Sequence, residues 1–198
     1  MIRQTLHHFK KLPSHLRTGF SHHLLSPRAV LDELQVKEGD TIFEVGNPVG
    51  FFASAGLSVI GQPGRYIVAG PNEDSFDRVA HLTHHKQLER VLLADVLMNR
   101  AFEHGSADWI MLTNVLSSSL HPAQFCMAIG DYLKPSGRVV LLDWKVGQAA
   151  GPEADRRVDS EQAIRMLTDC GMIFERTLNT PGYHYGLVFQ AGSTVRYE

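Results

Sequence analysis

Short apolar runs separated by amphipathic segments form the main pattern of this chain. Runs typical of buried strands, rich in β-branched and aromatic residues, lie at residues 41–46, 65–69, 89–95, 108–114 and 138–144. Segments with the apolar spacing of a helix lie at 27–35, 49–60, 74–86, 122–133 and 160–170. Strands that alternate with helices predict βαβ units, in which neighbouring strands are parallel.

The last two apolar runs break this alternation. Residues 172–180 and 183–190 are typical of two strands, and Pro181–Gly182 between them provides a turn. These runs predict an antiparallel hairpin at the end of a mostly parallel sheet. The expected fold class is therefore α/β.

The first 26 residues have weak periodicity, four basic residues and five histidines. We expect residues 1–26 to be a mobile or loosely docked arm, and residues 27–198 to form the domain. Two other interpretations stay open for the arm, a metal-binding tract and a lid over a binding site. The irregular histidine spacing, with no carboxylate or cysteine nearby, favours the plain arm.

Composition narrows the classes of function. The chain has 198 residues and 43% hydrophobic content, which fits one globular domain. A net charge of −2 gives no electrostatic reason to expect nucleic acid or an anionic membrane as the main partner. No apolar run reaches the roughly 20 residues that span a bilayer, so we expect a cytoplasmic protein. Cys126 and Cys170 lie on predicted helices and are expected to be reduced, buried thiols.

The turn after the first strand is the strongest candidate for a binding site. The strand ends at Glu44, and Gly46-Asn47-Pro48-Val49-Gly50 then leads into an apolar, Ala-rich segment. A strand that enters a helix through such a turn places backbone N–H groups and the positive end of a helix dipole at the carboxyl edge of the sheet. Ligands of open α/β sheets bind at that edge. The charge of Glu44 would disfavour a phosphate and suits a ligand with hydroxyl groups or a positive charge.

These residues resemble the first motif of the class I S-adenosylmethionine-dependent methyltransferases, E/D-x-G-x-G-x-G. Glu44, Gly46 and Gly50 match the motif, and Pro48 replaces its middle glycine. Leu133-Lys134-Pro135-Ser136-Gly137 resembles the family's LKPGG turn. The resemblance covers about residues 27–190. It is closest to the small ubiquinone/menaquinone C-methyltransferase-like, type 11/25 group, through residues 143–145 and 183–185.

The resemblance implies a Rossmann-like, doubly wound sheet of seven strands and S-adenosylmethionine as the cofactor. The implied cofactor-binding residues follow the first four strands: Glu44, Gly46, Asn47, Gly50, Gly70, Pro71, Asn72, Asp95, Val96 and Asn114. Gly70 stands where the family has an acid that holds the ribose hydroxyls. Glu73 or Asp74 is then available from the next loop, although Asp74 is the better candidate for an N-cap. Asp95-Val96 matches the family's adenine contact, and the alternative for Asp95 is a cap on a turn at 97–102.

Methyl transfer needs aligned reactants more than a dedicated catalytic side chain. If a base is required, His184 and His121 are the candidates, because imidazole titrates near neutral pH. Trp144, Lys145, Tyr183 and His184 are the candidate substrate residues. His81 and His85 lie one turn apart on a predicted helix, but with no third ligand nearby we expect a solvated face and no metal site.

Two functions follow from these observations. The first is a methyltransferase that acts on a small molecule by in-line displacement. The alternative is a non-catalytic protein of the same fold, with weakened or lost cofactor binding, that acts as a binding or assembly module. Pro48 and Gly70 favour the alternative because both departures fall on cofactor contacts.

Overall fold

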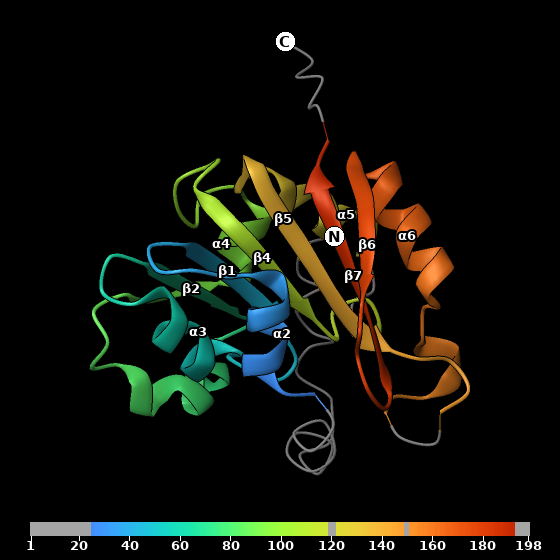
Figure 1. Ribbon diagram of the computed structural model, residues 1–198, viewed down its shortest axis with the longest axis horizontal. Helices are drawn as coiled ribbons and strands as arrows, with labels where there is room; N and C mark the ends of the chain where they lie inside the picture. Colours follow the sequence, from blue (N-terminus) through green and yellow to red (C-terminus); the bar gives the residue numbers. More distant parts are fainter. Residues whose placement is uncertain (1–24, 119–121, 149–150, 193–198) are drawn as a thin grey trace.

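A single mixed β-sheet organises the protein (Figure 1). The computed structural model describes residues 25–118, 122–148 and 151–192. Within these residues the sheet has seven strands in the order β3-β2-β1-β4-β5-β7-β6. Their bounds are β1 Thr41–Gly46, β2 Arg65–Gly70, β3 Leu88–Leu92, β4 Ala107–Thr113, β5 Leu133–Trp144, β6 Met172–Leu178 and β7 His184–Ala191.

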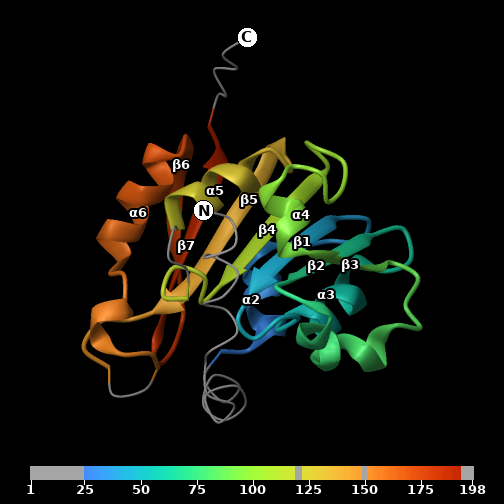
Figure 2. The ribbon, with the colours of Figure 1, turned by 180° about the vertical axis from the view of Figure 1, so that it is seen from behind.

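Helices cover both faces of the sheet (Figures 1 and 2). One face carries α2 Pro27–Leu34, α3 Ala53–Ile60 and the 3₁₀ helix η2 Glu73–Leu82. The other carries α4 Leu93–Leu97, α5 Pro122–Gly130 and α6 Ser160–Asp169, and the short 3₁₀ helix η3 Ala154–Arg156 precedes α6. Each face has its own apolar core, so the central strands are buried on both sides.

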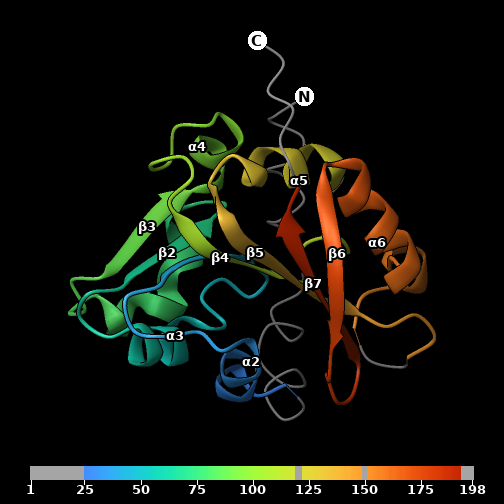
Figure 3. The same ribbon diagram turned by 45° about the horizontal axis from the view of Figure 1, so that its top comes forward.

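Strand directions confirm the fold expected from the sequence. β1 to β5 pair in parallel, while β7 pairs antiparallel with both β5 and β6. In the tilted view of Figure 3, β6 and β7 form the closing hairpin. The pairing of β5 with β7 sets Trp144 opposite His184, so β7 begins at the edge where the parallel strands end. The chain therefore brings residues from its last strand to the edge that carries the first turn.

Local signals explain the helix next to the start of the described chain. The Oγ of Ser26 accepts a hydrogen bond from the N–H of Ala29, and Pro27 stands at the first helical position. Val30, Leu31 and Leu34 form its buried face. The predicted helix at 27–35 is confirmed to within one residue. The predictions for residues 1–24 and for His121 lie outside the described residues.

The helix predicted at 74–86 is wrong in type and length. Residues 73–82 form a 3₁₀ helix, and its N-cap is Asn72, whose side chain accepts from the N–H of Ser75 at 3.1 Å. Asp74 therefore lies in the first turn and is not the cap. The helix ends before His85, so His81 and His85 do not share a helical face. Three-residue periodicity tightens the turn and moves later side chains off the expected face.

Three other boundaries differ from expectation. The third strand ends at Leu92, and Asp95 lies in the first turn of α4 and not at the end of a strand. The helix after the first turn begins at Ala53, because residues 49–52 belong to the turn. The helix predicted at 122–133 ends at Gly130, and β5 begins at Leu133.

The two cysteines are free, and their side chains are hydrogen-bonded to each other. Cys126 is buried on α5, as expected. Cys170 is the C-cap of α6 and is only partly buried, so the prediction that both are buried is wrong for Cys170. The hydrogen bond from Cys126 lowers the pKa of the Cys170 thiol to about 7. In the part of the chain described, no helix is long and apolar enough to cross a bilayer.

Candidate functional site

The first turn lies directly on the sheet. The N–H of Asn47 donates to the carbonyl of Thr113 at 2.9 Å, which extends the pairing of β1 with β4 beyond the strand. The Asn47–Pro48 peptide bond is cis. Gly50 has a φ of +73°, and a Cβ there would lie 2.2 Å from Cγ1 of Val79 on η2. Only glycine fits this position, for both its backbone and its contact.

Glu44 holds the end of the turn through a hydrogen bond to the backbone of Phe52. Its carboxyl group is fully buried and accepts hydrogen bonds from the N–H of Phe52 at 3.2 Å and from the hydroxyl of Tyr66 at 2.5 Å. Burial raises the pKa of Glu44 to about 7, against the lowering effect of these hydrogen bonds. Both oxygens are therefore engaged within the protein, and the role of Glu44 in cofactor binding stays a prediction. Tyr66 was not foreseen as its partner; the pairing of β1 with β2 was the available signal.

The end of β2 has no room for an acidic side chain. A Cβ at Gly70 would lie 2.1 Å from Oγ of Ser75 and 2.9 Å from the ring of Phe76. Pro71 follows, and the side chain of Asn72 is occupied as the cap of η2. Ser75 and Phe76 therefore pack where an acidic side chain at position 70 would lie. Replacing Gly70 by an acid would require these neighbours to move.

Asp95 and Val96 have different surroundings on α4. Val96 is buried in the core, while Asp95 forms an ion pair with Arg100 at 2.9 Å, with 36% of its side chain exposed. Leu92 at the end of β3 pairs with Gly70, so α4 starts beside the end of β2. This placement is compatible with the predicted adenine contact, which stays a prediction.

A second group of polar residues lies at the ends of β4, β5 and β7. Asn114 follows β4, is buried and has a φ of +55°, a strained conformation for a residue other than glycine. Its Nδ2 donates to the carbonyl of Asn47 at 2.8 Å, and its Oδ1 lies 3.1 Å from Nε2 of His184. Asn114 thus links the first turn to the start of β7.

His184 is the most enclosed of the predicted site residues on this side. It is 1% exposed, and its buried Nδ1 has no hydrogen-bond partner among the residues that the structure describes. Burial and, to a smaller extent, the positive charge of Lys145 together lower the pKa of His184 to about 4. The imidazole is therefore neutral at physiological pH. The hydroxyl oxygen of Thr113, one residue before Asn114, is also buried and has no partner in the described part of the chain.

Trp144 packs against His184, with ring centroids 4.2 Å apart and an interplanar angle of 39°. Gly151 packs against Trp144 as well, because a Cβ at Gly151 would lie 2.5 Å from Cε3 of the indole. Trp144 therefore helps to fix the position of His184 and remains partly exposed. Sequence reasoning had proposed it as a substrate contact.

Lys145 and Tyr183 meet at the hairpin. The backbone N–H of Lys145 donates to the carbonyl of Tyr183 at 2.8 Å, and Nζ of Lys145 lies 3.1 Å from the carbonyl of Gly182. The ammonium group thus stabilises the hairpin loop. Tyr183 is half-buried beside His184.

Sequence reasoning did not assign a role to Asp143, the last buried acid of this region. Its Oδ2 accepts from the N–H of Leu116 at 2.9 Å and of Ser117 at 3.4 Å, and its Oδ1 accepts from the N–H of Trp144 at 2.8 Å. Burial raises its pKa. Asp143 therefore holds the chain that follows β4 against the end of β5. An acid at the end of an apolar strand run was the signal that could have revealed it.

Comparisons with known proteins find matches to the structure of this chain but not to its sequence. No protein-family model matches the sequence, and no curated protein matches it. A SAM-dependent methyltransferase from Aquifex aeolicus is 21% identical, with a TM-score of 0.78 over 89% of this chain and 95% of that chain. A putative type 11 methyltransferase from Sulfolobus solfataricus is 19% identical, with a TM-score of 0.71 over 88% and 97% of the two chains. The fold is that of the S-adenosylmethionine-dependent methyltransferases.

The methyltransferase fold divides the predicted site residues into two groups. Glu44, Gly46, Asn47, Gly70 and Asp95 lie along β1, β2 and α4, whereas Trp144, Lys145, Tyr183 and His184 lie on β5 and the hairpin. Asn114 joins the two groups through its hydrogen bonds. The described residues contain no group of three His, Cys, Asp or Glu side chains arranged to hold a metal ion.

Proposed function

We propose that the protein is an S-adenosylmethionine-dependent methyltransferase that acts on a small molecule. The observation that carries the proposal is the concentration of buried polar side chains at one edge of the sheet. Among the buried polar residues in the described chain, Asp40 lies at the opposite edge of the sheet. The others lie on or next to the ends of β1, β4 and β5 or the start of β7: Glu44, Thr113, Asn114, Ser117, Ser118, Asp143, Thr180 and His184. Burying polar groups costs free energy, so their concentration favours a functional site.

The described residues fit the cofactor better at the first turn than at β2. Gly46 and Gly50, at the two ends of the turn, carry no side chains. Thr113, whose hydroxyl oxygen has no hydrogen-bond partner in the described residues, pairs in register with Gly46. At β2 the ribose would have to bind through the loop at 71–74, where Glu73 and Asp74 are exposed. When bound, S-adenosylmethionine would supply a methyl group on a sulfonium, and the protein's part is to align the acceptor and exclude water.

One observation favours the alternative, a non-catalytic protein of the same fold. Ser75 and Phe76 fill the space beside Gly70, so the ribose acid is missing and its place is closed. Losing one charge-assisted contact reduces affinity by roughly ten- to a hundredfold. Such a loss weakens cofactor binding without abolishing it, so the enzyme remains the better-supported function.

Calorimetric titration with S-adenosylmethionine and S-adenosylhomocysteine tests the proposal. We expect dissociation constants in the micromolar range. Asp95→Asn should weaken binding several-fold, while Asp32→Asn, on the exposed face of α2, should leave it unchanged. No heat at millimolar ligand, with folded protein, would support the non-catalytic alternative. Gly50→Asp is a poor test because the contact with Val79 makes misfolding the expected result.

A further inference from the structure

The hydrogen bonds around His184 define which ring nitrogen carries its proton. Nδ2 of Asn114 donates to the carbonyl oxygen of Asn47, which fixes the orientation of the amide. Oδ1 of Asn114 therefore faces Nε2 of His184, 3.1 Å away. An amide oxygen only accepts hydrogen bonds, so Nε2 must be the protonated nitrogen. Nδ1 is then a bare lone pair.

This lone pair has no donor in the described structure. Nδ1 is fully buried and has no hydrogen-bond partner, although the ring is held by Asn114 on one edge and by Trp144 on its face. Leaving a buried acceptor without a donor costs free energy. An acceptor that is rigidly positioned and left unsatisfied is the arrangement expected where a ligand supplies the missing donor.

The electrostatic surroundings keep Nδ1 available. Lys145 is the charged group that acts on His184 in the described chain, and with burial it keeps the imidazole neutral above about pH 4. Asn114 and Trp144, which contact the ring, carry no charge. The acceptor is thus unprotonated throughout the physiological range.

We propose, on the basis of the methyltransferase function proposed above, that Nδ1 of His184 binds the hydroxyl group of the substrate and receives its proton, so that the protein is an O-methyltransferase. A lone pair on the hydroxyl oxygen forms the bond to the methyl carbon. The carbon–sulfur bond breaks and leaves its electron pair on sulfur. The hydroxyl proton passes to Nδ1, so the positive charge lost from the sulfonium reappears on the imidazolium.

A hydroxyl group is the acceptor that suits this site best. It retains its proton at neutral pH and is a strong hydrogen-bond donor, whereas a thiol donates weakly and ionises more readily. An amine needs no base once it is neutral, and a weak base does not deprotonate an ammonium group. Oxygen that has gained a methyl group while keeping its proton is a very strong acid, so even a weakly basic imidazole removes that proton.

The tautomer can be tested without a substrate. Long-range ¹H–¹⁵N NMR of the full chain should show His184 as the neutral Nε2–H form, with Nδ1 unprotonated from pH 8 down to about pH 5. An Nδ1–H tautomer, or a ring that protonates near pH 6.5, would overturn the proposal. His184→Gln assigns the resonance, and exposed His81 provides an internal comparison.

The substrate class is tested with a fixed set of acceptors and methyl-labelled S-adenosylmethionine. The set contains catechol, benzyl alcohol, benzylamine, benzyl mercaptan and acetylacetone. His184→Gln retains an N–H toward Asn114 but lacks the Nδ1 acceptor, and His81→Gln is the matched surface control. We expect methyl transfer to a hydroxyl compound. Its rate should fall by at least about a hundredfold in His184→Gln and stay unchanged in His81→Gln.

Cofactor binding separates the two possible failures. S-adenosylhomocysteine should bind both variants within twofold of wild type, because His184 lies outside the cofactor-binding group. No binding by wild type would overturn the methyltransferase proposal and this inference together. Normal binding would overturn the inference alone if transfer went only to nitrogen, sulfur or carbon, if no hydroxyl compound reacted, or if His184→Gln kept its rate.

Discussion

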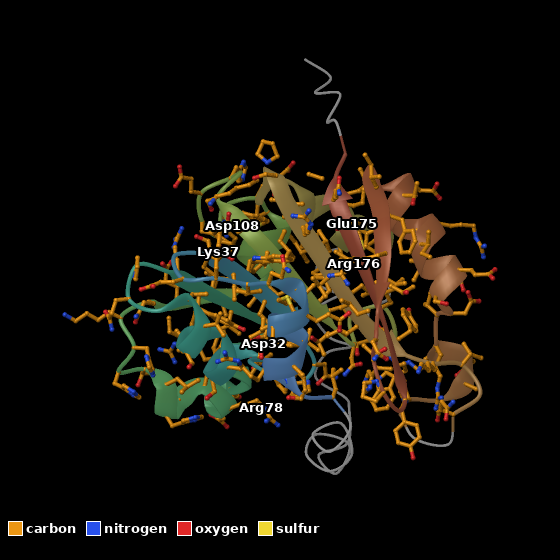
Figure 4. The ribbon with its side chains drawn as sticks, in the orientation of Figure 1. Asp32, Lys37, Arg78, Asp108, Glu175 and Arg176 are labelled. Atoms are coloured by element: carbon orange, nitrogen blue, oxygen red, sulfur yellow. The ribbon has the colours of Figure 1, made fainter. Side chains whose placement is uncertain are left out.

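The two edges of the sheet use polar residues in opposite ways. Near the amino edge, a groove of about 520 Å³ runs between α2 and β6 and is lined largely by charged side chains, among them Lys37, Asp108, Glu175 and Arg176 (Figure 4). Its charges pair with each other, Arg138 with Glu175, Arg176 with Glu33 and Lys134 with Asp108, through side chains that are 24–39% exposed. At the carboxyl edge the polar groups are buried, and within the described residues two of their atoms have no hydrogen-bond partner.

The difference shows which property locates a site. Charges in the groove are numerous, but solvent and opposite charges satisfy them, and such pairs contribute little. Buried groups at the carboxyl edge have unmet hydrogen-bonding capacity, which is costly and therefore informative. If this reasoning is correct, substitutions at the carboxyl edge should change the free energy of unfolding more than substitutions in the groove.

The largest expected effect comes from Asp143. Asp143→Ala would leave the buried N–H groups of Leu116, Ser117 and Trp144 without an acceptor. We expect a loss of about 4 kcal/mol in the free energy of unfolding, measured by urea denaturation. Asp143→Asn keeps one acceptor oxygen and should lose about half as much. Equal effects of the two variants would contradict the role assigned to the carboxylate.

Glu44 should give the protein a pH dependence of opposite sign from most carboxylates. Its folded pKa of about 7 lies above the ordinary 4.5, so the folded state binds the proton more tightly. Stability from this group is complete below pH 4.5 and is lost as the pH rises to about 7, by on the order of 3 kcal/mol. Glu44→Gln, which does not titrate, should remove this slope in denaturation series from pH 4 to 8.

His184 contributes a slope in the other direction. Its folded pKa of about 4 lies below 6.5, so its stability contribution is present above pH 6.5 and is lost as the pH falls toward 4. The Glu44→Gln series should therefore show stability rising with pH between about 4 and 6.5. A variant curve parallel to the wild-type curve would show that Glu44 is not buried as described.

Asn114 should show an intermediate effect with a distinctive order. Asn114→Ala removes the hydrogen bonds that link Asn47 to His184 and keeps the unfavourable φ. We expect it to lower the free energy of unfolding by about 2 kcal/mol. Asn114→Gly relieves the backbone strain, so it should be less destabilising by about 1 kcal/mol. In both variants the NMR signal of His184 should show a mixture of tautomers. A more stable alanine variant would contradict the strain argument.

The smallest effect is expected in the groove. Glu175→Gln removes the ion pair with Arg138, which lies at the surface with the two side chains 24% and 37% exposed. We expect a change of about 0.5 kcal/mol, which becomes smaller still in 1 M NaCl. A loss above 2 kcal/mol would show that the amino edge is organised more like the carboxyl edge than the comparison states.

The sequence predicted most of the fold because its strongest signals are local. Apolar runs and turn residues gave the strands and the closing hairpin, and Ser26-Pro27 gave the start of α2. The third strand was predicted too long because Leu93 and Ala94 are apolar in a short helix as they would be in a strand. The 3₁₀ helix η2 was missed since periodicity over ten residues barely distinguishes it from an α-helix.

Candidate site residues were predicted from the sequence, but their contacts with each other were not. His184 and Asn114 were chosen separately, 70 residues apart, and only the sheet order reveals that they meet. The contact of Glu44 with Tyr66 and the role of Asp143 depend on pairing between strands in the same way. Side-chain protonation was beyond the sequence altogether, because it depends on burial.

Arg157 holds the segment after β5 through backbone hydrogen bonds. Its guanidinium donates to the backbone carbonyls of Lys145, Gln148 and Pro152. Carbonyl groups are the same in every residue, so these contacts are indifferent to the side chains that the segment carries. Substitutions at the exposed, described positions around this arginine therefore leave these backbone hydrogen bonds available.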